Sequence, residues 1–215
     1  MYAPLQGLLA QRLADVRTSG LYKQERLIDS AQGARVRLKD GRSALNLCAN
    51  NYLGLANHPQ VKAAAAAALE RWGYGLGSVR FICGTQTIHR ELEAAISDFL
   101  GTEDTILYSS CWDANGGLFE TILGPEDAVL SDALNHASII DGCRMARSNG
   151  AEVLTYPHFD LETLAANMES HSDARQVVVT DSVFSMDGDV APITRLAALC
   201  ARYSALLILD EAHAV

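Results

Sequence analysis

Short apolar runs alternate with amphipathic segments over the second half of the chain. Strands are predicted at residues 105–109, 128–132, 152–156, 177–183 and 205–209. Apolar residues recur at helical spacing over residues 114–123, 138–148, 161–171 and 192–203. Asp160 is a natural N-cap, and Pro192 suits the first turn of its helix. This alternation predicts an α/β fold with a mainly parallel sheet and helices on both faces.

The first part of the chain has a different pattern. Its predicted elements are an amphipathic helix over residues 5–16, a hairpin of residues 36–38 and 45–47 around Asp40-Gly41, and helices over residues 60–72 and 89–100. A glycine-rich stretch, residues 73–78, lies between the last two helices. We expect residues 1–50 to form an N-terminal helix and hairpin segment, and residues 51–215 to form a large domain.

Composition narrows the class of protein. The chain of 215 residues is 49% hydrophobic and 20% charged, with a net charge of −9. The acidic balance argues against a nucleic-acid surface, and no apolar stretch reaches the roughly 18 residues of a membrane span. The five cysteines are widely spaced and contain no Cys-x-x-Cys pair. We therefore expect reduced thiols, no disulfide framework, no metal site and a cytoplasmic location.

Polar residues follow several of the predicted strands. His136 follows residues 128–132, Ser185 follows residues 177–183, and Asp210 with His213 follows the last apolar run. Taken singly, each has a plain structural interpretation: a packed loop histidine, a turn cap, a helix N-cap or an ion pair. Carboxyl ends of parallel strands share one edge of a sheet, so these residues are expected to converge where a ligand binds.

The residue types suit an anionic, aromatic ligand. Residues 109–117 lie where a predicted strand is followed by a predicted helix, and the first-turn N–H groups of a helix attract phosphate; the small residues Ser109 and Ser110 allow close approach. No Gly-x-Gly-x-x-Gly fingerprint accompanies them, so a dinucleotide is not indicated. A carboxylate such as Asp210 can keep a pyridinium nitrogen protonated.

The run Asp210-Glu211-Ala212-His213 also spells a helicase box. A helicase needs a Gly-x-x-x-x-Gly-Lys-Ser/Thr loop. The only lysines are Lys23, Lys39 and Lys62, and none follows a glycine. The sequence therefore excludes the helicase interpretation.

Longer motifs resemble one enzyme family. Residues 48–55, 78–86, 108–120, 131–142 and 184–188 are similar, in order, to the α-oxoamine synthases. These are pyridoxal 5'-phosphate (PLP) enzymes of fold type I that join an amino acid to an acyl-CoA. The resemblance implies that residues 51–215 are the PLP-binding large domain, and that the C-terminal small domain is missing from this sequence.

The resemblance also implies roles for individual residues. Trp112 stands where Phe or Tyr is commoner in the family, and Glu211 replaces a frequent Asp or Ser. The backbone N–H groups of Cys111 and Trp112 would bind the cofactor phosphate, and His136 would stack on the pyridine ring. Ser185 and His213 would contact the phenolic oxygen of PLP, and Asp210 would contact its ring nitrogen. Asn51 would contact the substrate carboxylate. His136, Asp210 and His213 form the implied catalytic set, and His136 also faces the substrate.

The similarity is strongest to members that condense glycine with acetyl-CoA, giving 2-amino-3-oxobutyrate and CoA, within homodimers. Synthesis of 8-amino-7-oxononanoate, 5-aminolevulinate or sphingoid bases remains an alternative, as does a lysine-less binding or regulatory subunit. In this family the lysine that binds PLP covalently lies beyond the position of Val215. We therefore expect the chain to be an N-terminal fragment that is inactive by itself.

Overall fold

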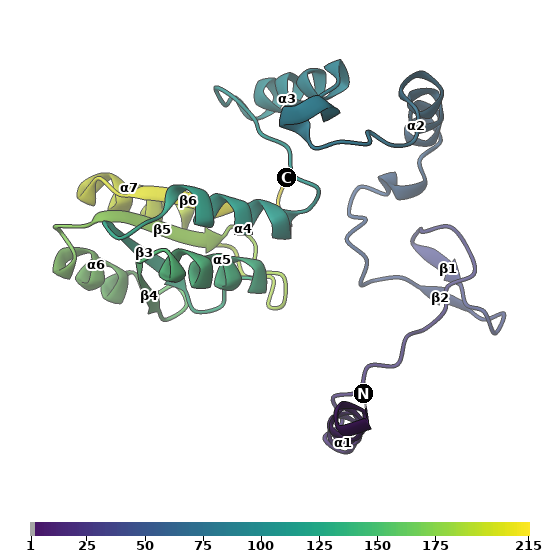
Figure 1. Ribbon diagram of the computed structural model, residues 1–215, viewed down its shortest axis with the longest axis horizontal. Coiled ribbons are helices and arrows are strands. Elements are labelled where there is room, and N and C mark those ends of the chain that lie inside the picture. The colour runs from purple at the N-terminus through teal and green to yellow at the C-terminus, as the bar shows by residue number, and fades with distance from the viewer. Residues whose placement is uncertain (1–2) are drawn as a thin grey trace. The chain divides into compact units, whose positions relative to one another are not determined.

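The computed structural model describes residues 3–215, and their side chains from residue 5 onward. The chain divides into two compact units, one reaching Gly77 and the other running from Ser78 to Val215. In Figure 1 the first unit is purple to blue and the second is teal to yellow. Each unit is described by itself. The division expected near residue 50 stays a prediction.

The first unit contains helices and one hairpin. Its elements are α1 (Ala3–Thr18), β1 (Arg35–Arg37), β2 (Ser43–Leu45), a short 3₁₀ helix (Leu55–Asn57) and α2 (Pro59–Trp72). β1 and β2 pair antiparallel with Val36 opposite Ala44, so the predicted hairpin forms, with both strands starting slightly earlier than expected. Gly41, at φ 86°, supplies the left-handed residue of the turn.

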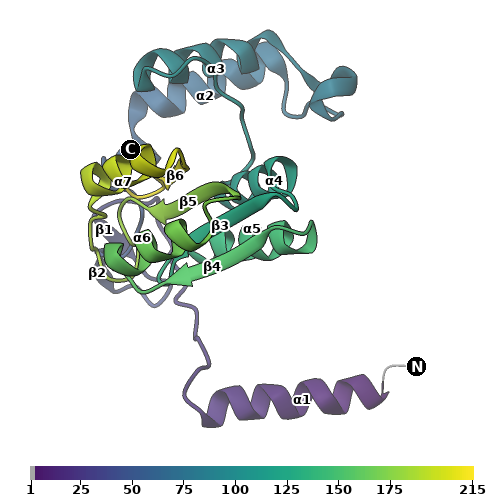
Figure 2. The ribbon, with the colours of Figure 1, turned by 90° about the vertical axis from the view of Figure 1, so that its left-hand side faces the viewer.

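The second unit is an α/β layer structure. Its elements are a helical turn (Arg80–Gly84), α3 (Thr87–Leu100), α4 (Cys111–Ile122), β3 (Asp127–Asp132), α5 (Ala137–Ser148), β4 (Glu152–Tyr156), α6 (Leu161–Ser170), β5 (Arg175–Asp181), α7 (Ile193–Tyr203) and β6 (Leu206–Asp210). The last four strands form one parallel sheet in the order β4-β3-β5-β6, as Figure 2 shows for β4, β3 and β5.

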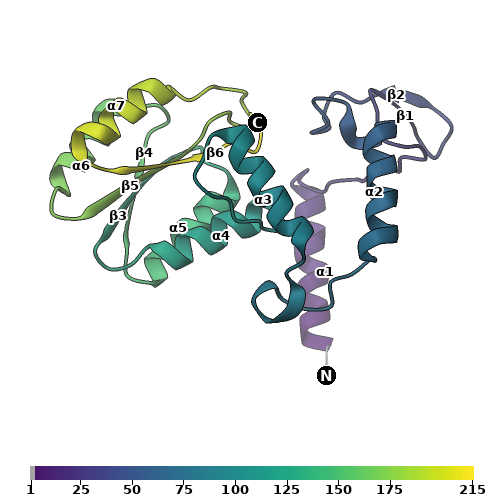
Figure 3. The ribbon, with the colours of Figure 1, turned by 90° about the horizontal axis from the view of Figure 1, so that it is seen from above.

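Two hydrophobic cores lie on opposite faces of this sheet. Successive strand residues alternate between them, so Val129 belongs to the core with Phe119 and Ile139, whereas Leu130 belongs to the core with Leu164. Figure 3 shows α4 and α5 on one side of the sheet and α6 and α7 on the other. The predicted α/β class, parallel sheet and two helical layers are confirmed.

Four local predictions need correction. Residues 105–109 are not a strand: no strand of residues 3–215 pairs with them, and an extended segment without a partner has no ladder to join. α4 starts at Cys111 rather than residue 114 because Ser110 caps it. α3 starts at Thr87 because Gln86 and His89 form a reciprocal capping box. Pro192 precedes α7 instead of opening it.

In the part of the chain that the structure describes, we find no helix with the length and apolar character needed to cross a membrane.

Candidate active site

The start of α4 is built to attract an anion. Ser110 accepts a hydrogen bond from the Asp113 N–H at 3.0 Å, which caps the helix. The Asp113 carboxylate accepts hydrogen bonds from the Ser109 and Ser110 hydroxyls at 2.6 and 2.9 Å, and these lower its pKa. The N–H groups of Cys111 and Trp112 belong to the first turn, which offers no acceptor within the helix. They lie at the positive end of the α4 dipole.

His136 follows β3 and caps α5. Its backbone N–H donates to Asp181 at 2.7 Å. Its ring Nδ1 lies 2.7 Å from the Ser138 hydroxyl and accepts from the Ser138 N–H at 3.3 Å, so the ring proton belongs on Nε2. The ring meets Trp112 edge to face, with centroids 5.7 Å apart. The structure thus brings together two residues that the sequence placed in separate motifs.

Asp210 ends β6, half-buried at the carboxyl edge of the sheet. One carboxylate oxygen accepts from the Asn115 amide at 2.8 Å and the other accepts from the Ala212 N–H at 2.9 Å. Both bonds fix the orientation of the carboxylate.

Asp181 is a second carboxylate at this edge. It pairs in register with Asp210 across β5 and β6. Burial raises the pKa of Asp181, and the neighbouring charge of Asp210 raises it further. The hydrogen bond from the His136 N–H lowers the pKa of Asp181, and so do the electrostatic interactions with His136 and His213. His213 therefore lies within electrostatic reach of this cluster.

A chain of hydrogen bonds connects Asp210 to His136. The Asn115 amide donates to Asp210 and also, at 2.9 Å, to the Ser138 hydroxyl, which in turn bonds the His136 ring. Sequence reasoning did not single out Asn115, Ser138 or Asp181. The available signal for Asn115 was a polar residue at the start of a predicted helix that follows a predicted strand.

The close packing of α4 on α5 makes this chain possible. A Cβ at Gly142 would lie 2.9 Å from the Phe119 ring and 3.1 Å from the Asn115 carbonyl oxygen. Gly142 therefore allows the two helices to approach at the level of Asn115. Asn135, beside His136, adds a tie to the sheet by donating to the Val179 carbonyl and accepting from the Asp181 N–H.

Two predicted residues stand apart from this network. Ser185 is exposed on the loop between β5 and α7. Asn51 belongs to the first unit, where its side-chain oxygen accepts from the Ala56 N–H at 3.0 Å. The network therefore joins Trp112, His136 and Asp210, with His213 nearby, and the roles of all the predicted site residues stay predictions.

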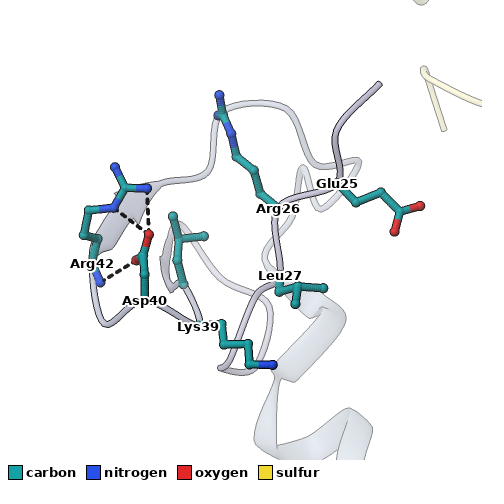
Figure 4. Close-up of a pocket in the computed structure, with 7 residues that line it drawn as sticks. Glu25, Arg26, Leu27, Lys39, Asp40 and Arg42 are labelled. Atoms are coloured by element: carbon teal, nitrogen blue, oxygen red, sulfur yellow. Dashed lines mark hydrogen bonds and ion pairs between the residues drawn. The ribbon is translucent and has the colours of Figure 1, made fainter. Parts of the chain in front are cut away.

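The first unit has a surface hollow of its own, shown in Figure 4. Charges of both signs surround it, and Asp40 is already paired with Arg42 at 2.7 Å. None of the predicted site residues lines this hollow, so it does not compete with the edge of the sheet as the candidate active site.

The class of protein follows from comparison with known families. The family model described as Aminotransferase class I and II matches residues 42–215, and the chain belongs to this family.

Individual relatives are closely similar in sequence. The chain is 52% identical over 210 residues to the 2-amino-3-ketobutyrate coenzyme A ligase of Escherichia coli K12, covering 96% of this chain and 52% of that protein. It is 53% identical over 215 residues to the mitochondrial ligase of the same name from Homo sapiens, covering 99% and 50%. The 8-amino-7-oxononanoate synthase of Geobacter sulfurreducens is 45% identical, covering 95% and 52%. The chain spans about half the length of the curated relatives it matches.

Solved structures agree on the fold. Serine palmitoyltransferase from Sphingomonas wittichii superposes with a TM-score of 0.84 at 30% identity, covering 98% of this chain and 52% of that one. The enzyme from S. paucimobilis with a bound PLP–myriocin aldimine gives 0.85, also at 30% identity, over 98% and 52% of the two chains.

Proposed function

We propose that the chain belongs to a PLP-dependent glycine C-acetyltransferase, which joins glycine to acetyl-CoA and releases CoA and 2-amino-3-oxobutyrate. The observation that carries this proposal is the 52–53% identity, over nearly the whole chain, to proteins named 2-amino-3-ketobutyrate coenzyme A ligase. The alternative with most support is 8-amino-7-oxononanoate synthesis, suggested by the relative at 45% identity.

The residues at the sheet edge fit PLP in three respects. The first turn of α4 offers N–H groups to its phosphate, as described above. The aromatic pair of Trp112 and His136 offers a wall for a flat ring. The half-buried carboxylate of Asp210 suits a protonated ring nitrogen, because its two oxygens are already oriented by Asn115 and Ala212.

Each residue would then have a defined task. When bound, PLP supplies an electron sink that stabilises negative charge on the glycine Cα. Asp210 would hold a proton at the ring nitrogen, and His136 would stack on the ring and face the substrate. Ser185 and His213 would donate hydrogen bonds to the phenolic oxygen. Asn51 would bind the glycine carboxylate.

The reaction balances without an oxidant or reductant. The glycine Cα loses a proton and forms a bond to the acetyl carbon, while the thioester carbon–sulfur bond breaks and CoA leaves as its thiol. The reverse direction cleaves 2-amino-3-oxobutyrate into glycine and acetyl-CoA.

We infer that the lysine that binds PLP covalently is not among residues 1–215, because Lys23, Lys39 and Lys62 match no family position.

We further propose that the whole protein is a homodimer located in the cytoplasm. The bacterial relative carries no organelle in its name, whereas the human one is called mitochondrial. Sedimentation velocity of the full-length protein and fractionation of its native cells test the two statements. A monomer, or recovery in an organelle, would contradict the respective proposal.

The decisive experiment is glycine-dependent CoA release from acetyl-CoA by the full-length protein with PLP. We expect Asp210→Asn to lower the rate strongly, and the neighbouring Glu211→Gln to leave it nearly unchanged. Pimeloyl-, succinyl- and palmitoyl-thioesters, each offered with the appropriate amino acid, test the alternative syntheses. Faster turnover of any of these than of acetyl-CoA with glycine would replace the proposed substrate. No turnover by the full-length protein would favour the binding or regulatory subunit.

A further inference from the structure

A second cluster of titratable side chains lies at the carboxyl edge of the sheet, outside the network of Asp210. His158, just after β4, is placed between two carboxylates. Its Nδ1 lies 2.9 Å from Asp132 at the end of β3, and its Nε2 lies 3.4 Å from Asp189 on the loop between β5 and α7. The His158 side chain is only 19% exposed and that of Asp132 only 1%, so the first pair is shielded from solvent.

The contacts of Asp132 decide which His158 nitrogen carries a proton. Its two oxygens also accept hydrogen bonds from the N–H groups of Leu134 and Phe159, at 2.9 and 3.1 Å. Because the Asp132 carboxylate accepts hydrogen bonds from these two backbone N–H groups, it is also the acceptor in its contact with His158. His158 Nδ1 is therefore the donor in that contact. The same contacts hold Phe159 at φ 58°, a conformation that a phenylalanine rarely adopts.

The other nitrogen of His158 then faces a charge. Nε2 is buried and makes no hydrogen bond, yet its nearest charged neighbour is the Asp189 carboxylate. A ring N–H at this position is attracted to a carboxylate oxygen, so the His158 ring can link Asp132 and Asp189. The ring also stacks on Phe159, with centroids 3.7 Å apart. The nearby Tyr156 hydroxyl stays neutral because burial raises its pKa.

His158 touches both ends of the loop that carries Ser185. The ring of Phe184, buried in the core, meets His158 edge to face with centroids 4.5 Å apart. At the other end the Asp189 carboxylate lies 3.4 Å from His158 Nε2. Bonds from the Phe184 N–H to the Asp189 carbonyl and from the Gly188 N–H to the Phe184 carbonyl close the loop between these anchors.

We propose that His158 is a positioning residue that ties this loop to the ends of β3 and β4 and thereby sets the position of Ser185. The consequence for Ser185 rests on the proposed function, in which Ser185 contacts the cofactor. The tie itself depends only on the contacts of His158 with Asp132, Asp189 and Phe184. Loss of the His158 ring would release the Asp189 end of the loop.

Amide hydrogen exchange of residues 184–191 in the full-length protein tests the tie directly. His158→Asn retains a donor toward Asp132 but has no second ring nitrogen and no ring to meet Phe184. After correction for intrinsic exchange, we expect its loop to exchange about tenfold faster than the loop of the unaltered protein.

Asp189→Asn is the matched variant, on a side chain that is 53% exposed and therefore tolerant of change. Its amide can still form a hydrogen bond with Nε2, so the loop protection should stay near that of the unaltered protein. Equal protection in all three proteins would overturn the tie.

The affinity for PLP, followed by absorbance, tests the consequence for Ser185. Weaker binding by His158→Asn supports it, and unchanged binding despite a loosened loop overturns it. If the unaltered protein binds no PLP, the proposed function fails, while hydrogen exchange still decides the tie.

Discussion

Single side chains orient the candidate site through neighbours that do not themselves look catalytic. Asp210 is held by Asn115, which also holds Ser138, and Ser138 sets the ring of His136. The Asn115 amide donates to both Asp210 and Ser138, and the Ser138 hydroxyl in turn donates to the His136 ring, so the network has one consistent assignment of protons. Removing a single member leaves a partner without its bond.

Asn115→Ala tests this network. Asp210 and Ser138 would both lose a donor at a poorly exposed site, so we expect the free energy of unfolding to fall by about 1–3 kcal/mol. Urea denaturation of the variant measures it. Asn149→Ala is the control, because Asn149 makes a single exposed hydrogen bond to the Glu120 carbonyl. Equal losses in the two variants would show that the buried network adds no stability.

Asp127 is a second informative residue, at the amino edge of the sheet. Its fully buried carboxylate receives two hydrogen bonds from Arg175, at 2.5 and 2.8 Å, and one from the Gly124 N–H. Asp127→Ala should destabilise the protein by about 1.5–3 kcal/mol, the range for hydrogen bonds to charged groups. Asp40→Ala, which breaks an exposed pair with Arg42, should have little effect.

The contribution of Asp127 also has a defined pH dependence. The Arg175 guanidinium lowers the pKa of this carboxyl in the folded protein. Its stabilisation is therefore complete above the ordinary carboxyl pKa of about 3.9 and is lost as pH falls through the lower folded value. Unfolding curves of the unaltered protein and Asp127→Ala should converge in acid. Curves that stay parallel down to the acid transition would contradict this assignment.

At the scale of elements, helix starts matter more to the site than helix interiors. The sequence correctly predicted α5, α6 and β4 to within a residue, because their apolar periodicity is strong. The sequence placed the start of α4 three residues late, because Ser110, Cys111 and Trp112 do not show the helical spacing of apolar residues. Capping chemistry, rather than hydrophobic pattern, puts the N–H groups of Cys111 and Trp112 at the helix end.

Ser110→Ala tests the cap. Loss of its bond to the Asp113 N–H should cost about 1 kcal/mol of stability and fray the first turn of α4. Ser109→Ala is the matched control, since Ser109 also bonds the Asp113 carboxylate but does not cap the helix. Thermal unfolding monitored by circular dichroism compares them. A larger loss in the control would show that the Asp113 carboxylate, not the cap, organises this turn.

At the scale of the whole molecule, the chain is two compact units joined through a glycine-rich stretch. Gly73, Gly75 and Gly77 surround Tyr74, whose side chain is 97% exposed. Exposed loop segments of small residues are preferred sites of proteolysis.

We therefore expect brief chymotrypsin treatment to cut first after Tyr74 and to leave a resistant product containing residues 78–215. Mass spectrometry of the products identifies the cut. Tyr74→Ser should slow this cut and leave later cuts unchanged. First cleavage within the parallel sheet would contradict the division into two units.

The alternation of short apolar runs with amphipathic segments determined the α/β class, because the strands of a parallel sheet covered by helices are buried on both faces and must be apolar throughout. The sequence also predicted that His136 and Asp210 converge, because parallel strands end at one edge and each residue follows such a strand, whereas Ser185, predicted on the same ground, stands apart from the network. Only the tertiary structure decided how they connect. Asn115 reaches Asp210 and Ser138 through packing of α4 on α5, and His158 meets Asp189 across a loop; neither contact has a sequence period. Residues 105–109 show the same limit, because strand pairing depends on a neighbour that a local apolar pattern does not specify.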